Sequence, residues 1–374
     1  MPLKVGVVGV NGIGKIHSDC HAKNPLAKLV AVCDVIKSRA DETAAKHKVK
    51  AYYRLSDMLA AQPDLDIVDV ATGGDENGGW HYEPTMQALG AGKNVLVEKP
   101  ISNDINLARE MVALAAEKDL YLGCNLNHYF TEPANKAKQL MAEGKIGEQI
   151  FCLHRMGFNG GEFTYGGPDK GANFGGFPYA HVKAFLAHPF SLMRYFCGDI
   201  THVQAFMNRP GFRRAASDVM VSINSIHVTF ANGALGYLFS QRGDATMGLG
   251  GWWSIEVGGT RGTFCIENCV EKMTFYPAPG AAGKADPAKL DLGKADQPVV
   301  LNTGVTDFGT TFPNRINAYL EDVTNRVPKH QLRASGRDAL ATLEYTFAAI
   351  QSYEQGGALV QPHPLPPPWR AAGA

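Results

Sequence analysis

Residues 5–17, VGVVGVNGIGKIH, join an apolar run to a helical pattern through a glycine-rich turn. The dinucleotide-binding fingerprint G-x-G-x-x-G would place glycines at positions 9, 11 and 14, after a first strand and before a first helix. Gly9 and Gly14 fit, whereas position 11 is Asn11 with Gly12 beside it. Because asparagine tolerates left-handed backbone better than other non-glycine residues, we expect the turn to form, although the Asn11 Cβ would crowd a pyrophosphate. A glycine-rich turn with a purely structural role is the alternative.

A carboxylate follows at the spacing that the fingerprint requires. The run LVAVCD ends in Asp34, where a second strand would present its tip to the ribose hydroxyls of an adenosine. At about 6 Å, this charge would cost a 2′-phosphate on the order of 3 kcal/mol per unit of charge at an effective dielectric near 20. NAD is therefore favoured over NADP. Lys37 and Arg39 either soften this preference or are solvated charges at a helix start.

Apolar runs and helical patterns alternate through the first third of the chain. Strands that alternate with helices at this length predict an α/β domain, a doubly wound Rossmann-type parallel sheet, over residues 1–124. The predicted strands are 3–9, 28–34, 64–71, 94–98 and 120–125, and the predicted helices are 13–24, 35–48, 83–92 and 104–118.

The pattern changes after about residue 125. A helix beginning with Pro133 and ending at Gly144 precedes a succession of strand-like runs, and ANGA (231–234) is typical of a hairpin turn. Successive strands predict an α+β domain over residues 125–374 with a large, open, mostly antiparallel sheet. Two further helices are expected near 313–326 and 338–355.

Composition excludes several classes of protein. Lys plus Arg and Asp plus Glu both number 36, which gives no reason to expect nucleic acid or an anionic membrane as a partner. The chain starts without a signal-peptide layout and has no apolar stretch long enough to span a bilayer. Seven scattered cysteines without a C-x-x-C pair indicate free thiols in a reducing compartment and no zinc site. A cytoplasmic protein without a bound metal is expected.

The segment VEKPIS (97–102) completes a set of motifs that resembles one family. The chain is similar to the Gfo/Idh/MocA oxidoreductases in GVVGVNGIGKIH, VAVCD, DIVDVAT, ALGAGKNVLVEKPIS, GCNLNHYF, GKIGE, MRYFCGD and EYTFAAIQSYEQGGALV. The resemblance covers nearly the whole chain. It implies a Rossmann domain followed by an open antiparallel sheet, a sugar or polyol substrate oxidised with NAD(P), and a homodimer or homotetramer.

The resemblance gives Lys99 the central role. In this family, the lysine of the E-K-P turn orients the reacting hydroxyl and tunes its proton loss, and an ammonium beside a hydroxyl becoming a ketone stabilises the developing oxyanion. Pro100 restricts the backbone around Lys99. Glu98 either holds the amine or meets the nicotinamide ribose. An exposed Glu-Lys pair at a strand end is the alternative reading.

The second catalytic position departs from the family pattern. The family commonly places D-x-x-x-H ten residues before a glycine, and His188 occupies that histidine position, with Ala184 where the acid would be. Ser191 stands where the family often has another acid. Three alternatives remain for His188. It acts as the general base with another group orienting its ring, it is a buried structural histidine, or another residue acts as the base. The candidates for that role are His181, Lys183, Tyr179 and Tyr165.

Two glycine-rich loops, 72–84 and 157–181, are expected at the cofactor and carbohydrate ends of the site, and a disordered surface loop is the alternative for the second. The expected NAD contacts are Gly9, Asn11, Gly12, Ile13, Gly14, Asp34, Arg39, Thr72, His81, Glu98, Lys99, Pro100 and Asn127. The expected substrate contacts are Tyr165, Tyr179 and Lys183.

Three functions remain open on the sequence. The first is an NAD-dependent dehydrogenase of a sugar, polyol or glycoside, with Lys99 handling the hydroxyl and His188 or a neighbour taking its proton. The second is a redox-neutral enzyme that oxidises a sugar transiently, eliminates the aglycone and reduces the sugar again. The third is a non-catalytic protein that binds a sugar or NAD, which Ala184 favours and Lys99 opposes.

Overall fold

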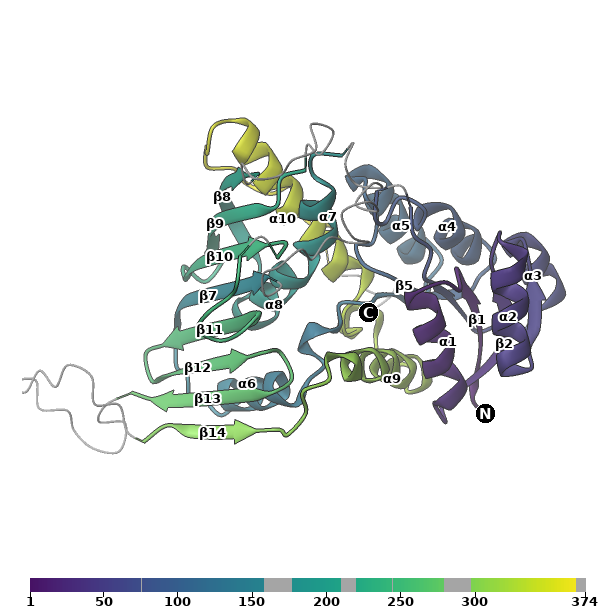
Figure 1. Ribbon diagram of the computed structural model, residues 1–374, viewed down its shortest axis with the longest axis horizontal. Helices are drawn as coiled ribbons and strands as arrows, with labels where there is room; N and C mark the ends of the chain where they lie inside the picture. The colour runs from purple at the N-terminus through teal and green to yellow at the C-terminus, as the bar shows by residue number, and fades with distance from the viewer. Residues whose placement is uncertain (75, 158–176, 210–219, 244, 279–296, 368–374) are drawn as a thin grey trace, which may run out of the picture.

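The computed structural model describes residues 1–374 apart from 75, 158–176, 210–219, 244, 279–296 and 368–374. Two open sheets form two domains with helices packed between and around them (Figure 1). The chain passes from the first sheet to the second after the strand that ends at Cys124.

The first domain is a six-stranded sheet in the order β3-β2-β1-β4-β5-β6. Every strand pair in it is parallel, as predicted, and the strand order reverses between β1 and β4. The short β3 and α3 were not predicted, because so few residues give little periodicity. The elements are β1 (Leu3–Val8), α1 (Ile13–Lys23), β2 (Ala27–Cys33), α2 (Lys37–His47), β3 (Lys50–Tyr52), α3 (Leu55–Ala61), β4 (Ile67–Val70), α4 (Tyr82–Gly90), β5 (Asn94–Val97), α5 (Ile105–Glu117) and β6 (Leu122–Cys124).

The second domain is an eight-stranded sheet in the order β14-β13-β12-β11-β7-β10-β9-β8. Neighbouring strands are antiparallel except β7 and β10, which confirms the mostly antiparallel prediction. The predicted ANGA turn joins β9 to β10, and Gly233 at its tip has a φ of 88°. The strands are β7 (Gln149–Gly157), β8 (Ile200–Asn208), β9 (Ile223–Phe230), β10 (Leu235–Gln241), β11 (Trp253–Gly259), β12 (Gly262–Glu267), β13 (Lys272–Pro277) and β14 (Val299–Asn302).

Helices of the second domain cover one face of this sheet. Two of them, α8 and α10, lie between the sheet and the first domain (Figure 1). The long α10 begins with a capping box, in which the Ser335 hydroxyl accepts from the Asp338 amide and the Asp338 carboxylate accepts from the Ser335 amide. The remaining elements are η1 (Asn127–Tyr129), α6 (Glu132–Ala142), α7 (Ala180–Phe185), α8 (Ala187–Cys197), η3 (Phe308–Thr310), α9 (Thr311–Thr324), η4 (Lys329–Gln331) and α10 (Gly336–Glu354).

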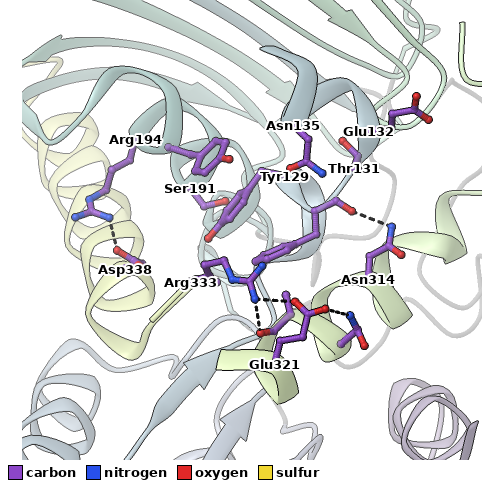
Figure 2. Close-up of a pocket in the computed structure, with 15 residues that line it drawn as sticks. Tyr129, Thr131, Glu132, Asn135, Ser191, Arg194, Asn314, Glu321, Arg333 and Asp338 are labelled. Atoms are coloured by element: carbon purple, nitrogen blue, oxygen red, sulfur yellow. Dashed lines mark hydrogen bonds and ion pairs between the residues drawn. The ribbon is translucent and has the colours of Figure 1, made fainter. Parts of the chain in front are cut away.

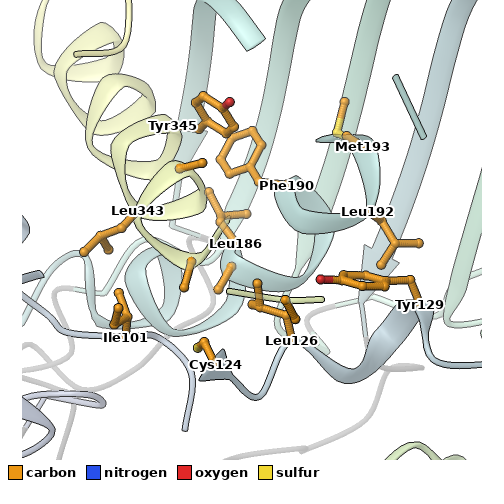
Figure 3. Packing of buried hydrophobic residues seen from close by; sticks show 14 of the residues in the cluster. Ile101, Cys124, Leu126, Tyr129, Leu186, Phe190, Leu192, Met193, Leu343 and Tyr345 are labelled. Carbon is orange, nitrogen blue, oxygen red and sulfur yellow. The ribbon is translucent and has the colours of Figure 1, made fainter. Parts of the chain in front are cut away.

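A continuous apolar core joins the two domains. Figure 3 shows Ile101 and Leu126 from the first domain's edge packed near Leu186 and Phe190 around α8 and Leu343 of α10. All five side chains are almost fully buried. Burying this much apolar surface at the junction favours one fixed arrangement of the domains.

Helix α9 returns from the second half of the chain to the first sheet. Its Ile316 and Tyr319 share a buried cluster with Val5 and Val7 of β1, and the Tyr319 hydroxyl donates to the Val95 carbonyl at 2.9 Å. In the same helix, the fully buried Arg315 donates to backbone carbonyls at the end of β6 and before α10. The first sheet is thus completed by residues that lie beyond position 310.

Two further observations concern membrane-spanning helices and cysteines. In the described part of the chain, no helix is both long and apolar enough to cross a bilayer. All seven cysteines are free, and most are buried.

Candidate active site

A cleft of about 1310 Å³ lies at the carboxyl ends of the first sheet's strands. This is where an open α/β sheet binds ligands, beside the point at which the strand order reverses. Residues from both domains line it, including His188 of α8 and Phe308 and Phe312 around the start of α9. Those predicted site residues that line it are Gly9, Asn11, Ile13, Asp34, Arg39, Thr72, His81, Glu98, Lys99, Asn127 and His188.

The glycine-rich turn is built as a phosphate cradle, with one change from the prediction. Gly9 has a φ of 82°, and a Cβ there would stand 2.8 Å from the Thr72 backbone. At Gly14, a Cβ would stand 1.7 Å from the Gly9 carbonyl oxygen, so a side chain is excluded. The left-handed position was predicted at Asn11 but is taken by Gly12, whose φ is 49° and beside which lies open space. The extra glycine therefore removes the conformational demand on Asn11.

Helix α1 begins directly after this turn and has no side-chain cap, so its amino end is available to an anion. Asp34 closes the same end of the cleft, where its Oδ2 accepts from the Val10 amide at 3.0 Å and its Oδ1 accepts from the Ile36 amide at 2.9 Å. A carboxylate has about four acceptor positions, so lone pairs remain for ribose hydroxyls. The cradle, the free helix end and this carboxylate fit a dinucleotide such as NAD.

His81 links two loops at the rim of the cleft. Its Nδ1 lies 2.7 Å from the Pro100 carbonyl oxygen, and its Nε2 lies 2.7 Å from that of Thr72. The Thr72 hydroxyl donates back to the Trp80 carbonyl at 2.7 Å. Burial lowers the pKa of His81. The ring therefore ties the glycine-rich loop 72–84 to the turn that carries Lys99.

Glu98 lines the cleft but is bound to groups of the first domain. Its Oε1 lies 3.0 Å from Nε2 of His17, and its Oε2 accepts from the Lys99 backbone amide at 3.0 Å. The Asn125 side-chain amide donates to the same Oε1. Glu98 therefore contacts the backbone of Lys99, while Lys99 itself lines the cleft.

The chain of contacts continues through the sheet. Nδ1 of His17 lies 3.0 Å from both carboxylate oxygens of Asp69, and Nε2 of His21 lies 2.6 Å from Asp69 Oδ2. Burial alone would lower the pKa of His17, but Asp69 and Glu98 raise it to about 10. Burial would likewise raise the pKa of both carboxylates, and His17 lowers them instead. This group of charges is fully buried.

His188 has an aromatic support in place of the missing acid. Its ring stacks on His128 with centroids 3.7 Å apart and 11° between planes. Nε1 of Trp253 donates to His128 Nδ1 at 3.1 Å, which leaves the proton of neutral His128 on Nε2. Nδ1 of His188 has no hydrogen-bond partner among the described residues. Burial, then His128 and Lys99, hold the pKa of His188 well below its usual value, so the ring is neutral near pH 7.

Other predicted residues lie away from the cleft. Lys183 forms an ion pair with Glu76 at 3.1 Å, and the Tyr179 hydroxyl donates to Glu354 at 2.8 Å. His181 stacks on Phe185 at 4.8 Å. Tyr165 is outside the described residues.

A second cavity of about 570 Å³ is lined in part by α8. Ser191 lines it and donates to the His188 carbonyl at 2.7 Å, so the position of the second family acid belongs to this cavity and does not line the cleft. Figure 2 shows its two arginines bound to acids, Arg194 to Asp338 and Arg333 to Glu321. With these charges already paired, we assign the chemistry to the larger cleft.

Several residues of the site were missed from the sequence, and some gave a signal. Asp69 lies inside the apolar run DIVDVA, and a carboxylate buried there requires a buried partner. His17 and His21 are four residues apart, on one face of a helix, and are that partner. Trp253 and Phe308 gave no such signal in the sequence, because their contacts with His128 join segments that are far apart in the chain.

Comparison with known proteins agrees with this geometry. Residues 3–126 match the model of an oxidoreductase family with an NAD-binding Rossmann fold, and residues 134–265 match the GFO/IDH/MocA C-terminal domain. Inositol 2-dehydrogenase of Rhizobium meliloti (strain 1021) is 23% identical over 359 residues, 94% of this chain and 97% of that protein. D-glucoside 3-dehydrogenase of Escherichia coli (strain K12) is 30% identical over 211 residues, 50% of this chain and 58% of that protein.

Solved structures share the fold at low identity. An NAD-binding oxidoreductase from Klebsiella pneumoniae has a TM-score of 0.81 at 20% identity, over 97% of this chain and 100% of that one. A levoglucosan dehydrogenase in complex with NADH and levoglucosan has a TM-score of 0.80 at 17% identity, over 98% of this chain and 100% of that one. The two family models together span more than half of the sequence. The chain therefore belongs to the Gfo/Idh/MocA family of NAD-binding oxidoreductases.

Proposed function

We propose that the protein oxidises a secondary hydroxyl of a sugar, polyol or glycoside, with NAD as the hydride acceptor. The observation that carries this proposal is the common cleft. Lys99 and His188, from different domains, both line the cleft, together with Gly9 and Asp34. After burial and His128, the Lys99 charge also lowers the pKa of His188. The named relatives act on inositol and on a glucoside, which supports the substrate class.

Lys99 would donate a hydrogen bond to the substrate oxygen and stabilise negative charge that develops there as the carbon loses its hydride. Bound NAD supplies the acceptor for that hydride. His188, which is neutral near pH 7, would accept the hydroxyl proton. Its stacking on His128 fixes the plane of the ring, a task that a carboxylate at position 184 would otherwise perform.

The walls of the cleft would keep water from the reacting atoms. Phe308 and Phe312 approach from α9 and the turn before it, and both line the cleft. A site closed by apolar rings strengthens the interaction between the Lys99 ammonium and a developing alkoxide, because the local dielectric falls.

The test is turnover with NAD over a panel of inositols, free sugars and simple glycosides, followed by the variants Lys99→Met and Lys118→Met. Removing a donor to a developing oxyanion costs about two to three powers of ten in kcat, so Lys99→Met should lose at least about a hundredfold. Lys118 is an exposed lysine after α5, and its substitution should leave kcat unchanged. NAD binding by both variants, measured calorimetrically, separates catalysis from cofactor loss. Full activity of Lys99→Met would refute the proposal.

A redox-neutral reaction on a glycoside is the second candidate. It is favoured because His188 Nδ1 has no carboxylate partner among the described residues and a base with a low pKa readily returns the proton it takes. Release of a chromophoric aglycone without net NADH would identify this route, and NADH equal to the substrate consumed would exclude it.

We infer that the protein works as a homodimer or homotetramer. The face of the second sheet opposite α8 and α10 exposes Leu153, Phe206 and Leu235, which a second copy would cover. Light scattering on the purified protein decides the oligomeric state, and a monomer at micromolar concentration would refute this inference.

A further inference from the structure

We propose that His17 is a positioning residue for catalysis, which holds Lys99 through Glu98 from inside the first domain. The proposal rests on the function proposed above for Lys99. It concerns a group that does not line the cleft. Its route to the site is two contacts long, from the His17 ring to the Glu98 carboxylate and from that carboxylate to the Lys99 backbone amide.

The geometry leaves Glu98 little freedom. One oxygen meets His17 at 3.0 Å and also accepts from Asn125, while the other accepts from the Lys99 amide at 3.0 Å. The Glu98 residue is 6% exposed and His17 is fully buried. These contacts hold the Glu98 carboxylate at the backbone of Lys99. Lys99 is thereby fixed at its backbone and keeps its amine for the cleft.

The charges explain why this arrangement holds. A histidine whose ring meets carboxylates at both nitrogens is doubly protonated, and the imidazolium compensates Asp69 on one side and Glu98 on the other. Without it, Asp69 would keep only His21 as a histidine partner and Glu98 would lose the imidazolium in a buried site, which is strongly unfavourable. Among the described residues, no group of three or more histidines, cysteines or acids has an arrangement that could hold a metal.

His21 supplies a matched control. It is one turn further along α1, equally buried, and bound to the same carboxylate of Asp69 at 2.6 Å. No contact joins His21 to Glu98 among the described residues. A purely structural role predicts similar effects of His17→Gln and His21→Gln, whereas the positioning role predicts that substitution of His17 alone reaches Lys99.

The first experiment measures Lys99 directly and does not depend on turnover. The full-length protein and both variants are labelled with acetic anhydride, and acetylation of Lys99 relative to Lys118 is followed by mass spectrometry. In His17→Gln, Glu98 no longer fixes the Lys99 backbone, so the labelling rate of Lys99 should rise several-fold. In His21→Gln, the labelling rate of Lys99 should stay at the wild-type value. Equal rates in the two variants would overturn the proposal.

The second experiment measures the catalytic consequence. A misplacement of about 1 Å at a reacting group can cost a hundredfold, so kcat of His17→Gln should fall about tenfold or more with the Kd for NAD unchanged. If wild-type protein oxidises no substrate, the proposed function fails, and the labelling result still decides the role of His17.

A second variant covers the case in which His17→Gln does not fold. His17→Gln combined with Glu98→Gln removes one positive and one negative charge together, so the net charge of the buried group is unchanged and Asp69 keeps its contact with His21. The amide of Gln is a weaker acceptor than the carboxylate for the Lys99 N–H, and Lys99 labelling should again exceed that of His21→Gln. A rate equal to that of His21→Gln would overturn the proposal as well.

Discussion

The protonated state of His17 makes the stability of the fold depend on pH. Its pKa is raised from 6.5 to about 10, so the folded protein keeps a proton that the unfolded chain releases. This stabilisation is complete below the unfolded pKa of 6.5 and is lost as the pH rises toward the folded value. The groups that face the ring are Asp69 and Glu98, with His21 across Asp69, and the acids are ionised throughout this range.

The size of this pH effect on the free energy of unfolding follows from the release of one proton on unfolding. Between about pH 7 and about pH 8, a shift of this size should reduce the free energy of unfolding by about 1.2 kcal/mol, slightly less than the limit of about 1.36 per pH unit. The buried His128, His154 and His188 contribute little slope there, because burial lowers their pKa and both states are mostly neutral above pH 7. Buried thiols such as Cys33, whose pKa is raised by burial, reduce the free energy of unfolding mainly above about pH 8.5, because thiols ionise there in the unfolded chain.

Urea unfolding at several pH values measures the effect, with wild type and His17→Gln compared under identical conditions. Thiols contribute equally to both proteins, so the difference between the two slopes belongs to His17. Wild type should lose stability with pH, and the variant should lose about 1.2 kcal/mol less over the same interval. A wild-type slope that persists in the variant would show that His17 is not the titrating group.

Three other substitutions test separate parts of the structure. Gly14→Ala should abolish NAD binding in calorimetry, because its Cβ would overlap the Gly9 carbonyl at 1.7 Å, and an unchanged Kd would contradict the cradle. Trp253→Phe leaves His128 Nδ1 without its donor, so the free energy of unfolding in urea should fall by about 2–4 kcal/mol and kcat should also fall. If neither quantity changes, Trp253 does not support the stacked rings of His128 and His188. Arg315→Met unpairs two backbone carbonyls, and a cost of about 2–4 kcal/mol is expected; a gain would mean that removing the buried charge dominates.

Local patterns predicted the two sheets and most elements of the first domain, but not β13, β14 or α7 of the second. The first domain alternates strands and helices with clear periodicity, and only the shortest pair, β3 and α3, escaped notice. Successive strand-like runs likewise predicted the antiparallel sheet. The parallel pairing of β7 with β10 was beyond reach, because register between segments about eighty residues apart leaves no local trace.

Part of the cleft's lining could be predicted from motifs. Gly9, Gly14 and Asp34 were found from the spacing of the dinucleotide fingerprint, and Lys99 and His188 from the family resemblance, and all five line the cleft or its glycine-rich turn. Residues that act across elements were harder to predict. The support of His188 comes from a stack and an indole that meet only in the folded chain, and the partner of Glu98 stands on the first helix.

The return of α9 to the first sheet has a consequence for synthesis. When the ribosome has released the first six strands, the apolar side of β1 that Ile316 and Tyr319 will cover is still open to water. The Tyr319 hydroxyl that donates to the Val95 carbonyl lies 224 residues after that carbonyl in the chain. The nascent nucleotide-binding half must therefore wait, incomplete and in need of protection, until α9 has been translated.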